Sequence, residues 1–330
     1  MSRGAKIAVA VGVVVLFLLA VIVITQPKEE TVITNEDRLA AIPSSSVKMG
    51  PEDDEYLPVV HSSEWQQPIP MPGPVNTAGA EDSPYITDDG DWFFFFFTPD
   101  VTVPANEQLL DGVTGIWWTR MMGGEWTPPE RIVTHDDLSL DGAQACVGTT
   151  LWFASIRSDN FGEIDVYTAQ YEGGEWTDVE NAGEQLNVDY DIGEFHIMPN
   201  GTMMYFHSGK WDDGASMDIW SSVKVGDSWS EPVKVPGVNT DWANEGYPYV
   251  TPDGQELWFT AESRLGMGYT GPAIFRCVLQ PNGTWGEPEE VVSNFAGECT
   301  MDDDGNLYFV HHYFVDGEMV EADIYVAMKS

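Results

Sequence analysis

The chain has 330 residues, 43% of them hydrophobic, which is too high a fraction for a disordered chain and enough for a sizeable core. Its 54 acidic and 14 basic side chains give a net charge of -40, so few cations are available to displace counterions from a nucleic-acid backbone. Nucleic-acid binding is therefore excluded, while the length suits either two ordinary domains or one β-propeller.

An uncharged apolar run occupies residues 7–24, and its 18 residues are at the short end of what crosses a bilayer as a helix. Two basic residues precede it and no acid occurs before Glu29, so the positive-inside rule places the N-terminus in the cytoplasm. A cleaved signal peptide is the alternative, but no small-x-small cleavage site and no lipoprotein cysteine follow the run. We expect residues 1–25 to form a cytoplasmic stub and a single-pass transmembrane anchor.

A polar stretch follows over residues 26–55, rich in Ser, Pro, Glu and Asp. Such a segment buries too little apolar surface to offset the entropy lost on ordering. The sequence thus predicts a polar linker at 26–55 and a folded extracytoplasmic domain at 56–330.

The folded part contains a repeat in which an apolar strand meets a glycine turn and a second strand carries aromatic residues. One copy reads Tyr-Pro-Tyr-Val-Thr-Pro-Asp-Gly-Gln-Glu-Leu-Trp-Phe over residues 247–259. The turn glycines of the copies are Gly90, Gly148, Gly201, Gly254 and Gly305. A period slightly above 50 residues is typical of propeller blades, and Asp-Gly or Asn-Gly supplies the positive φ that a tight hairpin requires.

Two further strands complete each repeat: a third strand like Met-Asp-Ile-Trp at 217–220, and an outer strand that a Gly-Glu-Trp-like motif precedes. The motif tryptophans are Trp65, Trp126, Trp176, Trp229 and Trp285. The fifth repeat ends at Ser330 before its tryptophan strand, whereas Trp65 has no strands before it. We therefore expect the strand around Glu64–Ile69 to complete the last blade and remove the open edge. The prediction is an all-β fold, a five-bladed β-propeller of four-stranded blades closed by an N-terminal strand.

The run Thr251-Pro-Asp-Gly254 before Leu-Trp-Phe, with Asp-Ile-Trp at 218–220, resembles the TolB-type repeats among the WD-repeat-like β-propellers. The resemblance covers residues 56–330, although the first, second and fifth repeats have Asp-Asp-Gly or Val-Gly at the turn. It implies the propeller fold. Its functional implication is broad, because such propellers serve as interaction platforms, periplasmic sensors and enzyme accessories.

Each repeat also carries an acid seven to nine residues before its turn glycine. These acids are Asp82, Asp141, Glu194, Glu245 and Glu298. Inner strands of a propeller begin at the mouth of the central channel, so the five carboxylates are expected to converge there. Converging carboxylates raise one another's pKa, which suits a general acid, or they ligate a hard cation such as Ca²⁺. The alternative is a repeat residue that binds backbone amides of a neighbouring loop.

A glycoside hydrolase would use two such acids at a fixed separation, but none of the sequence motifs expected of that enzyme is present, and no catalytic residue is predicted. A sialidase would need an arginine cluster. The arginines available are Arg120, Arg131, Arg157, Arg264 and Arg276. Arg157 and Arg264 hold nearly equivalent repeat positions, which indicates loop structure. The acidic run at 302–306 resembles a calcium loop but aligns with the hairpin turns.

The remaining motifs concern the cysteines and two sequons. Cys146, Cys277 and Cys299 lie in apolar segments and are expected to be small buried hydrophobes, with a Cys146–Cys299 bridge only if those strands are neighbours. The sequons at Asn200 and Asn282 fall in predicted turns and are glycosylation candidates in a host with the machinery.

The acidic excess is spread along every repeat, which favours a high-salt habitat over a divalent-rich environment or a cationic partner. Taken together, the anchor, the linker and the ring predict a displayed platform at the cell membrane that binds a protein or a glycan. A carbohydrate-active enzyme and a structural cell-envelope protein are the alternatives.

Overall fold

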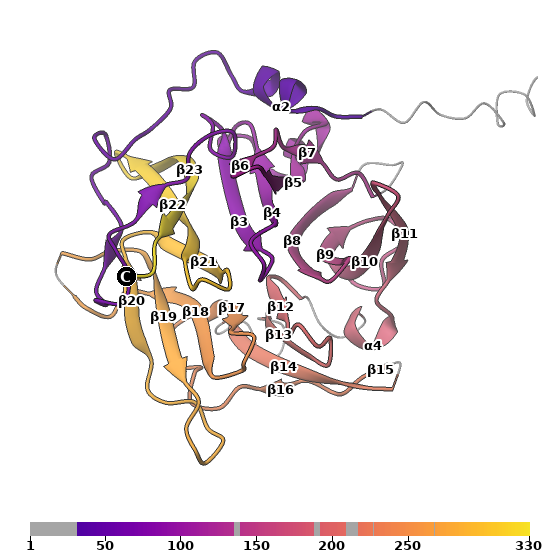
Figure 1. The fold of residues 1–330 in the computed structure, drawn as a ribbon, viewed down its shortest axis with the longest axis vertical. Coiled ribbons are helices and arrows are strands. Elements are labelled where there is room, and N and C mark those ends of the chain that lie inside the picture. The colour runs from indigo at the N-terminus through magenta and orange to yellow at the C-terminus, as the bar shows by residue number, and fades with distance from the viewer. Residues whose placement is uncertain (1–31, 135–138, 188–191, 209–216, 227, 267) are drawn as a thin grey trace, which may run out of the picture. The chain divides into compact units, whose positions relative to one another are not determined.

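Antiparallel strands dominate the computed structural model, which describes residues 32–134, 139–187, 192–208, 217–226, 228–266 and 268–330. Residues 33–330 form one compact unit (Figure 1). The predicted transmembrane run at 7–24 lies outside the described residues. Within them, no helix is long and apolar enough to cross a bilayer.

The described strands follow one another along the chain as antiparallel meanders. The first contains β3 (Ala80–Ile86), β4 (Trp92–Thr98), β5 (Gly115–Met122), β6 (Glu125–Trp126) and β7 (Glu130–Arg131). The second contains β8 (Leu140–Val147), β9 (Thr150–Ile156), β10 (Asp165–Glu172) and β11 (Glu175–Asn181). The third contains β12 (Phe195–Ile197), β13 (Met203–Ser208), β14 (Asp218–Val225), β15 (Ser228–Trp229) and β16 (Val233–Lys234).

The last two meanders have the same order. The fourth contains β17 (Gly246–Val250), β18 (Glu256–Glu262), β19 (Pro272–Val278) and β20 (Glu289–Ser293). The fifth contains β21 (Ala296–Met301), β22 (Leu307–Val315) and β23 (Glu318–Ala327). One parallel pair, Ala322 with Ala80, joins the fifth meander to the first in a nine-stranded sheet. The helices described are α2 (Asn35–Ala41), α3 (Ala105–Gln108), the 3₁₀ turn η1 (Leu109–Asp111) and α4 (Glu184–Asn187).

The hairpins between the first two strands of each meander form where the sequence predicts them. The five turn glycines all have positive φ, between 61° and 77°, a conformation that glycine adopts without the steric cost of a Cβ. Aromatic residues then follow in the second strand and are buried. In β4, for example, Phe93, Phe94 and Phe95 are all fully buried because both faces of the sheet pack against neighbours.

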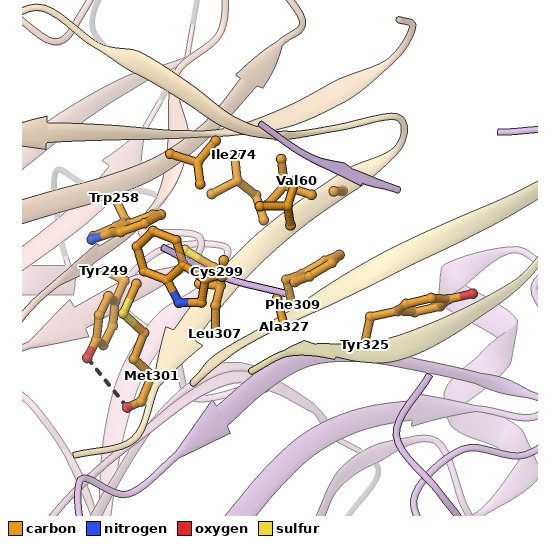
Figure 2. Packing of buried hydrophobic residues seen from close by; sticks show 14 of the residues in the cluster. Val60, Tyr249, Trp258, Ile274, Cys299, Met301, Leu307, Phe309, Tyr325 and Ala327 are labelled. Atoms are coloured by element: carbon orange, nitrogen blue, oxygen red, sulfur yellow. Dashed lines mark hydrogen bonds between the residues drawn. The ribbon is translucent and has the colours of Figure 1, made fainter. Parts of the chain in front are cut away.

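The meanders surround a common centre, an arrangement typical of a β-propeller (Figure 1). Their first strands contact one another in sequence: β3 with β8, β8 with β12, β12 with β17, β17 with β21, and β21 with β3. The hydrophobic core lies between neighbouring meanders. Figure 2 shows one such layer, where Tyr249 and Trp258 of the fourth meander pack with Met301 and Leu307 of the fifth.

The N-terminal strand pairs with the end of the chain, as predicted. β2 (Ile69–Pro70) is antiparallel to β23, and Trp65 forms a bridge with Lys329. The indole of Trp65 also donates to the Gly305 carbonyl at 2.9 Å. The sequence did not predict that a second segment, β1 (Val59–Val60), adds to the outer edge of the fourth meander by pairing with β20.

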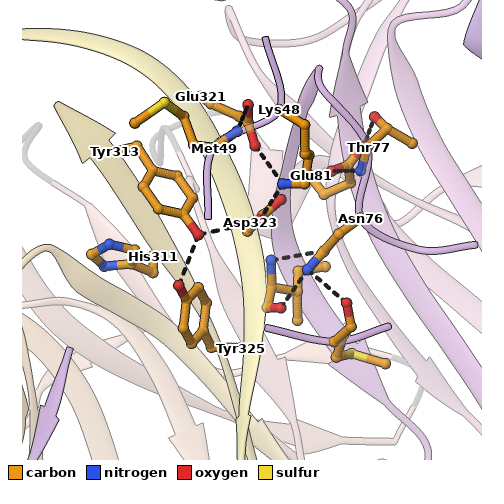
Figure 3. Close-up of polar contacts among 12 residues, drawn as sticks. Lys48, Met49, Asn76, Thr77, Glu81, His311, Tyr313, Glu321, Asp323 and Tyr325 are labelled. Carbon is orange, nitrogen blue, oxygen red and sulfur yellow. Dashed lines mark hydrogen bonds and ion pairs between the residues drawn. The ribbon is translucent and has the colours of Figure 1, made fainter. Parts of the chain in front are cut away.

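Residues 33–55, expected to be a linker, belong to the same compact unit as the strands. Thr34 and Asp37 form a capping box at the start of α2, and Arg38 of this helix is fully buried. Lys48 pairs with Glu321 and Asp323 of β23 (Figure 3). The segment is ordered although it is polar, because its charges meet oppositely charged groups that the strands bury.

The three cysteines are buried and free, as small hydrophobes would be, so the Cys146–Cys299 bridge is not formed. The acidic run at 302–306 is a hairpin turn in which Asp302 accepts from the backbone amide of Asn306.

Candidate functional site: a carboxylate pocket at the centre of the strands

The first strand of a meander carries a β-bulge near its start. The register shifts at this point in β3, β8, β17 and β21. Residues in the bulges have positive φ although they are not glycine: 47° at Ser83, 52° at Ala143, 54° at Tyr247 and 54° at Glu298. A bulge turns a side chain away from the direction that strand alternation would give it. These residues therefore determine which side chains face the centre.

Three of the five predicted acids come together there, from three different meanders. The hydroxyl of Ser83 lies 3.1 Å from Glu194 Oε1 and 2.9 Å from Glu298 Oε2, and Asp82 is hydrogen-bonded to Glu298. A hydroxyl has one proton, so Ser83 can donate to only one carboxylate. The other contact requires a proton on the second carboxyl group.

A cavity of about 40 Å³ adjoins these groups. Its lining includes Ser83, Gln144, Glu194, His196, Tyr247 and Glu298. The lining contains no lysine or arginine among the described residues. The cavity is thus a small acidic pocket in the part of the molecule where the first strands meet.

The electrostatics distinguish the three acids. Burial, followed by the charge of Asp82, raises the pKa of Glu194 to about 8. Burial and the charges of Asp82 and Glu194 raise the pKa of Glu298 well above its usual range. At neutral pH, Glu194 and Glu298 therefore hold protons.

Asp82 behaves in the opposite way. Burial alone would raise its pKa, but His312, the Ser83 amide and Glu298 stabilise the charged form more strongly, so its pKa is lowered. His312 Nε2 is 3.7 Å from Asp82 Oδ2, and despite its own burial the histidine has a raised pKa because of this partner. The pocket thus contains one ionised carboxylate, supported by a histidine, beside two protonated carboxyl groups.

The other two predicted acids do not join the pocket. Asp141 accepts from Ser155 at 2.5 Å and pairs with Arg157 at 3.3 Å. Glu245 is fully buried, accepts from the Thr240 amide and pairs with Arg264 at 3.0 Å. For these two, the expectation that all five acids converge is wrong. They bind loop groups, which is the alternative that the sequence left open.

Glu81, one residue before Asp82, belongs with this second group and was not predicted. It is fully buried, pairs with Arg38 at 2.5 Å and accepts from the Thr77 amide at 2.8 Å. Its position matches Asp141 and Glu245, each of which precedes a glycine. Glu194 and Glu298, in contrast, each follow a glycine. The sequence signal that separates the loop-binding acids from the pocket acids is therefore whether a glycine follows or precedes the acid.

The structure shows neither the metal site nor the arginine cluster that the sequence left open, as far as the described residues go. Among the described residues, no group of three or more His, Cys, Asp or Glu side chains is arranged to hold a metal ion such as Ca²⁺. The arginines lie in separate contacts: Arg157 and Arg264 pair within their meanders, and Arg276 pairs with Glu64 and Glu289. The two sequon asparagines, Asn200 and Asn282, are exposed in turns.

No family model matches the chain, and no curated protein matches it. Solved structures similar to it include a thermostable family-43 glycoside hydrolase, with TM-score 0.48, 14% identity and coverage of 77% of this chain and 91% of that one. TolB from Acinetobacter baumannii has TM-score 0.42 and 12% identity, over 77% of this chain and 56% of that one. A protein of unknown function from Dyadobacter fermentans has TM-score 0.44 and 13% identity, over 84% and 99%. These values identify neither a family nor an activity for this chain.

Proposed function

We propose that the chain is a five-bladed β-propeller, tethered to a cell membrane by residues 7–24 with its C-terminal domain outside the cytoplasm, and that it is a binding platform for a protein or a glycan. The blade count is supported by the five meanders and by the contacts of their first strands, which return from β21 to β3. The pairing of β2 with β23 acts as the closure of the ring. The anchor is supported by the apolar run alone.

The observation that carries the proposed function is the convergence of Asp82, Glu194 and Glu298 on Ser83. The buried carboxylates of Glu81, Asp141 and Glu245 are each matched by an arginine from the same chain. These three have only His312 as a basic partner among the described residues. A cluster that keeps two protonated acids beside a cavity, without a structural cation, is suited to binding an external group.

Binding is favoured over catalysis by the size of the cavity. Pockets that enclose a whole small molecule usually have about 300–1,000 Å³, whereas this one has about 40 Å³. It admits one polar group of a larger partner and not a complete sugar ring. We therefore assign the pocket a role in recognition.

A glycoside hydrolase-like enzyme is the second candidate, and one specific observation favours it. Two nearby carboxyl groups with pKa values shifted in opposite directions are the usual arrangement of an acid and a base, here Glu194 and Asp82. Glu194 is also close to the third acid: Glu194 Oε1 and Glu298 Oε2 both contact the Ser83 hydroxyl, so they lie at most about 6 Å apart.

The two candidates are separated by measuring binding and turnover on the same protein. Full-length protein in detergent would be applied to a glycan array and incubated with a panel of aryl glycosides, with Asp82→Asn and Glu194→Gln variants in parallel. Binding that is lost in Glu194→Gln without any turnover supports the platform, whereas turnover that is lost in both variants supports the enzyme. Glu125→Gln, an exposed acid outside the pocket, is the matched control and should change neither result.

A further inference from the structure

Two residues that line the cavity have a buried polar atom without a hydrogen-bond partner among the described residues. Gln144, at the start of the second meander, is 4% exposed and its amide nitrogen donates to the Ser83 carbonyl. Its side-chain oxygen has no hydrogen-bond partner among the described residues. A buried acceptor left without a donor costs about 1–3 kcal/mol, so this oxygen indicates a missing donor.

His196 presents a second such atom. The residue is 5% exposed, and its ring is hydrogen-bonded to the Val250 carbonyl, which requires a ring N–H. Nε2 has no partner among the described residues, so the N–H belongs to Nδ1 and Nε2 presents a lone pair. Burial lowers the pKa of His196 to about 4, so the ring is neutral at physiological pH.

The two unpartnered atoms, Gln144 Oε1 and His196 Nε2, are therefore both acceptors. The Glu194 and Glu298 carboxyl groups also line the cavity; they are protonated at neutral pH and become acceptors when they release that proton. An anion would find no cationic partner in this lining. A ligand that satisfies it must donate several hydrogen bonds and fit a space of about 40 Å³, enough for a group the size of one or two water molecules.

We propose that this cavity, between Gln144, His196, Glu194 and Glu298, binds a primary ammonium group on an unbranched carbon chain. An ammonium group has three donors and no acceptor, which matches the two unpartnered acceptor atoms and two carboxyl groups that can ionise beside a cation. A multidentate metal ion is disfavoured because no group of three or more His, Cys, Asp or Glu side chains among the described residues is arranged to hold one. The inference rests on the proposed function, in that it takes this pocket as the site of recognition, and it specifies the chemistry that is recognised.

The net charge of the chain agrees with such a ligand. At -40 the protein attracts cations from a distance and repels anions, which increases the rate of encounter with an amine. Two sources supply this chemistry, a free alkylamine and a lysine side chain of a protein partner. A narrow cavity accepts both, because each ends in an ammonium group on an unbranched methylene chain.

The test is a calorimetric titration of full-length protein in detergent with methylammonium chloride at constant ionic strength. We expect saturable binding that weakens at least about tenfold in Gln144→Met, because a charge-assisted hydrogen bond is lost. His196→Phe should weaken binding similarly. Gln255→Met, at an exposed turn, is the matched control and should leave the affinity unchanged. Near-ultraviolet circular dichroism of each variant would establish that it is folded.

Tetramethylammonium, which has no N–H donor, should not bind. Tighter binding of Nα-acetyl-lysine amide than of methylammonium would assign the site to a lysine side chain, and equal affinity would assign it to a free amine. Absence of saturable methylammonium binding overturns the inference, as does equal binding by folded Gln144→Met or displacement by Ca²⁺ at equimolar concentration. If any of these results is obtained but glycan or protein binding still depends on Glu194, the proposed function stands. Only the assignment of an ammonium ligand is then wrong.

Discussion

Two sets of carboxylates that are wholly or partly buried differ in what neutralises them. In the first set, the chain provides the cation: Arg38 pairs with Glu81, Arg264 with Glu245, and Lys48 with Asp323. In the second set, at the centre, Glu194 and Glu298 have no such partner and retain protons instead. The first set fixes loops and the N-terminal segment to the strands, and the second leaves an acidic pocket.

The difference shows that burial of an acid does not by itself indicate a functional site. An ionised carboxylate that is buried must be matched, and where the match comes from the same chain the pair is structural. Where it is absent, the acid takes up a proton and can exchange it for an external cation. Substitutions that remove one partner in each set should therefore have effects of different size and sign.

The largest effect is expected for Arg38→Met. The Arg38 and Glu81 side chains are both fully buried, so removal of the guanidinium leaves an unpaired carboxylate in the interior. We expect the free energy of unfolding to fall by about 3–5 kcal/mol. Urea unfolding of the full chain, followed by tryptophan fluorescence, measures the loss.

The control for that variant is Arg120→Met, which removes an arginine paired with Glu130 at 3.6 Å on the surface. Its cost should stay below about 1 kcal/mol. The double variant Arg38→Met with Glu81→Gln should recover part of the loss, because no unmatched charge remains. An Arg38→Met protein as stable as the wild type would mean that the N-terminal segment does not contribute to the fold.

A smaller effect, with opposite signs in the two sets, is expected for Glu→Gln substitutions. The pKa of Glu194 is about 8 in the folded chain and about 4.3 in the unfolded chain, so its contribution to stability is complete below pH 4 and is lost as pH rises toward 8. Glu194→Gln keeps a neutral side chain. It should therefore equal the wild type at pH 4 and exceed its unfolding free energy at pH 9.

Glu245→Gln supplies the comparison within the first set. It removes the charge that neutralises Arg264 and should be destabilising at neutral pH, where Glu194→Gln is neutral or stabilising. Other groups near Glu194 also titrate, namely Asp82, Glu298, His207, Tyr247 and His312. Groups that do not interact with Glu194 cancel in the difference between variant and wild type, which therefore reports the titration of Glu194 together with that of Asp82 and Glu298. Parallel pH profiles of the two proteins would contradict the raised pKa.

The sequence predicted the meanders and the N-terminal strand that pairs with the C-terminus, because both depend on local signals. Turn glycines and strand patterns act within about a dozen residues. The sequence predicted the acids of the pocket only in part, because it placed Asp141 and Glu245 there together with Asp82, Glu194 and Glu298. Counting back from the turn glycine does not separate Asp141 from Glu298, which have the same spacing, since the bulge inserts an extra residue and changes the direction of the side chain.

The N-terminal segment could not be predicted from composition, because its partners are remote along the chain. Lys48 meets Asp323 across 275 residues, and Arg38 meets Glu81 across 43. A polar segment is expected to be disordered when it has little apolar surface to bury. This one becomes ordered because the strands present buried acids that only its cations neutralise.

The smallest effect concerns the exposed acids, which belong to neither set. Between about 0.1 M and 1 M salt the screening length falls from about 10 Å to about 3 Å, which weakens repulsion among exposed charges and hardly alters buried pairs. At a net charge of -40 the wild type should gain about 1 kcal/mol, or roughly 2–4 °C in Tm. Arg38→Met should rise by the same amount, since the pair that it lacks is shielded from salt. A Tm indifferent to salt would contradict self-repulsion, and a larger rise in Arg38→Met would show that the Glu81 charge has become exposed to solvent.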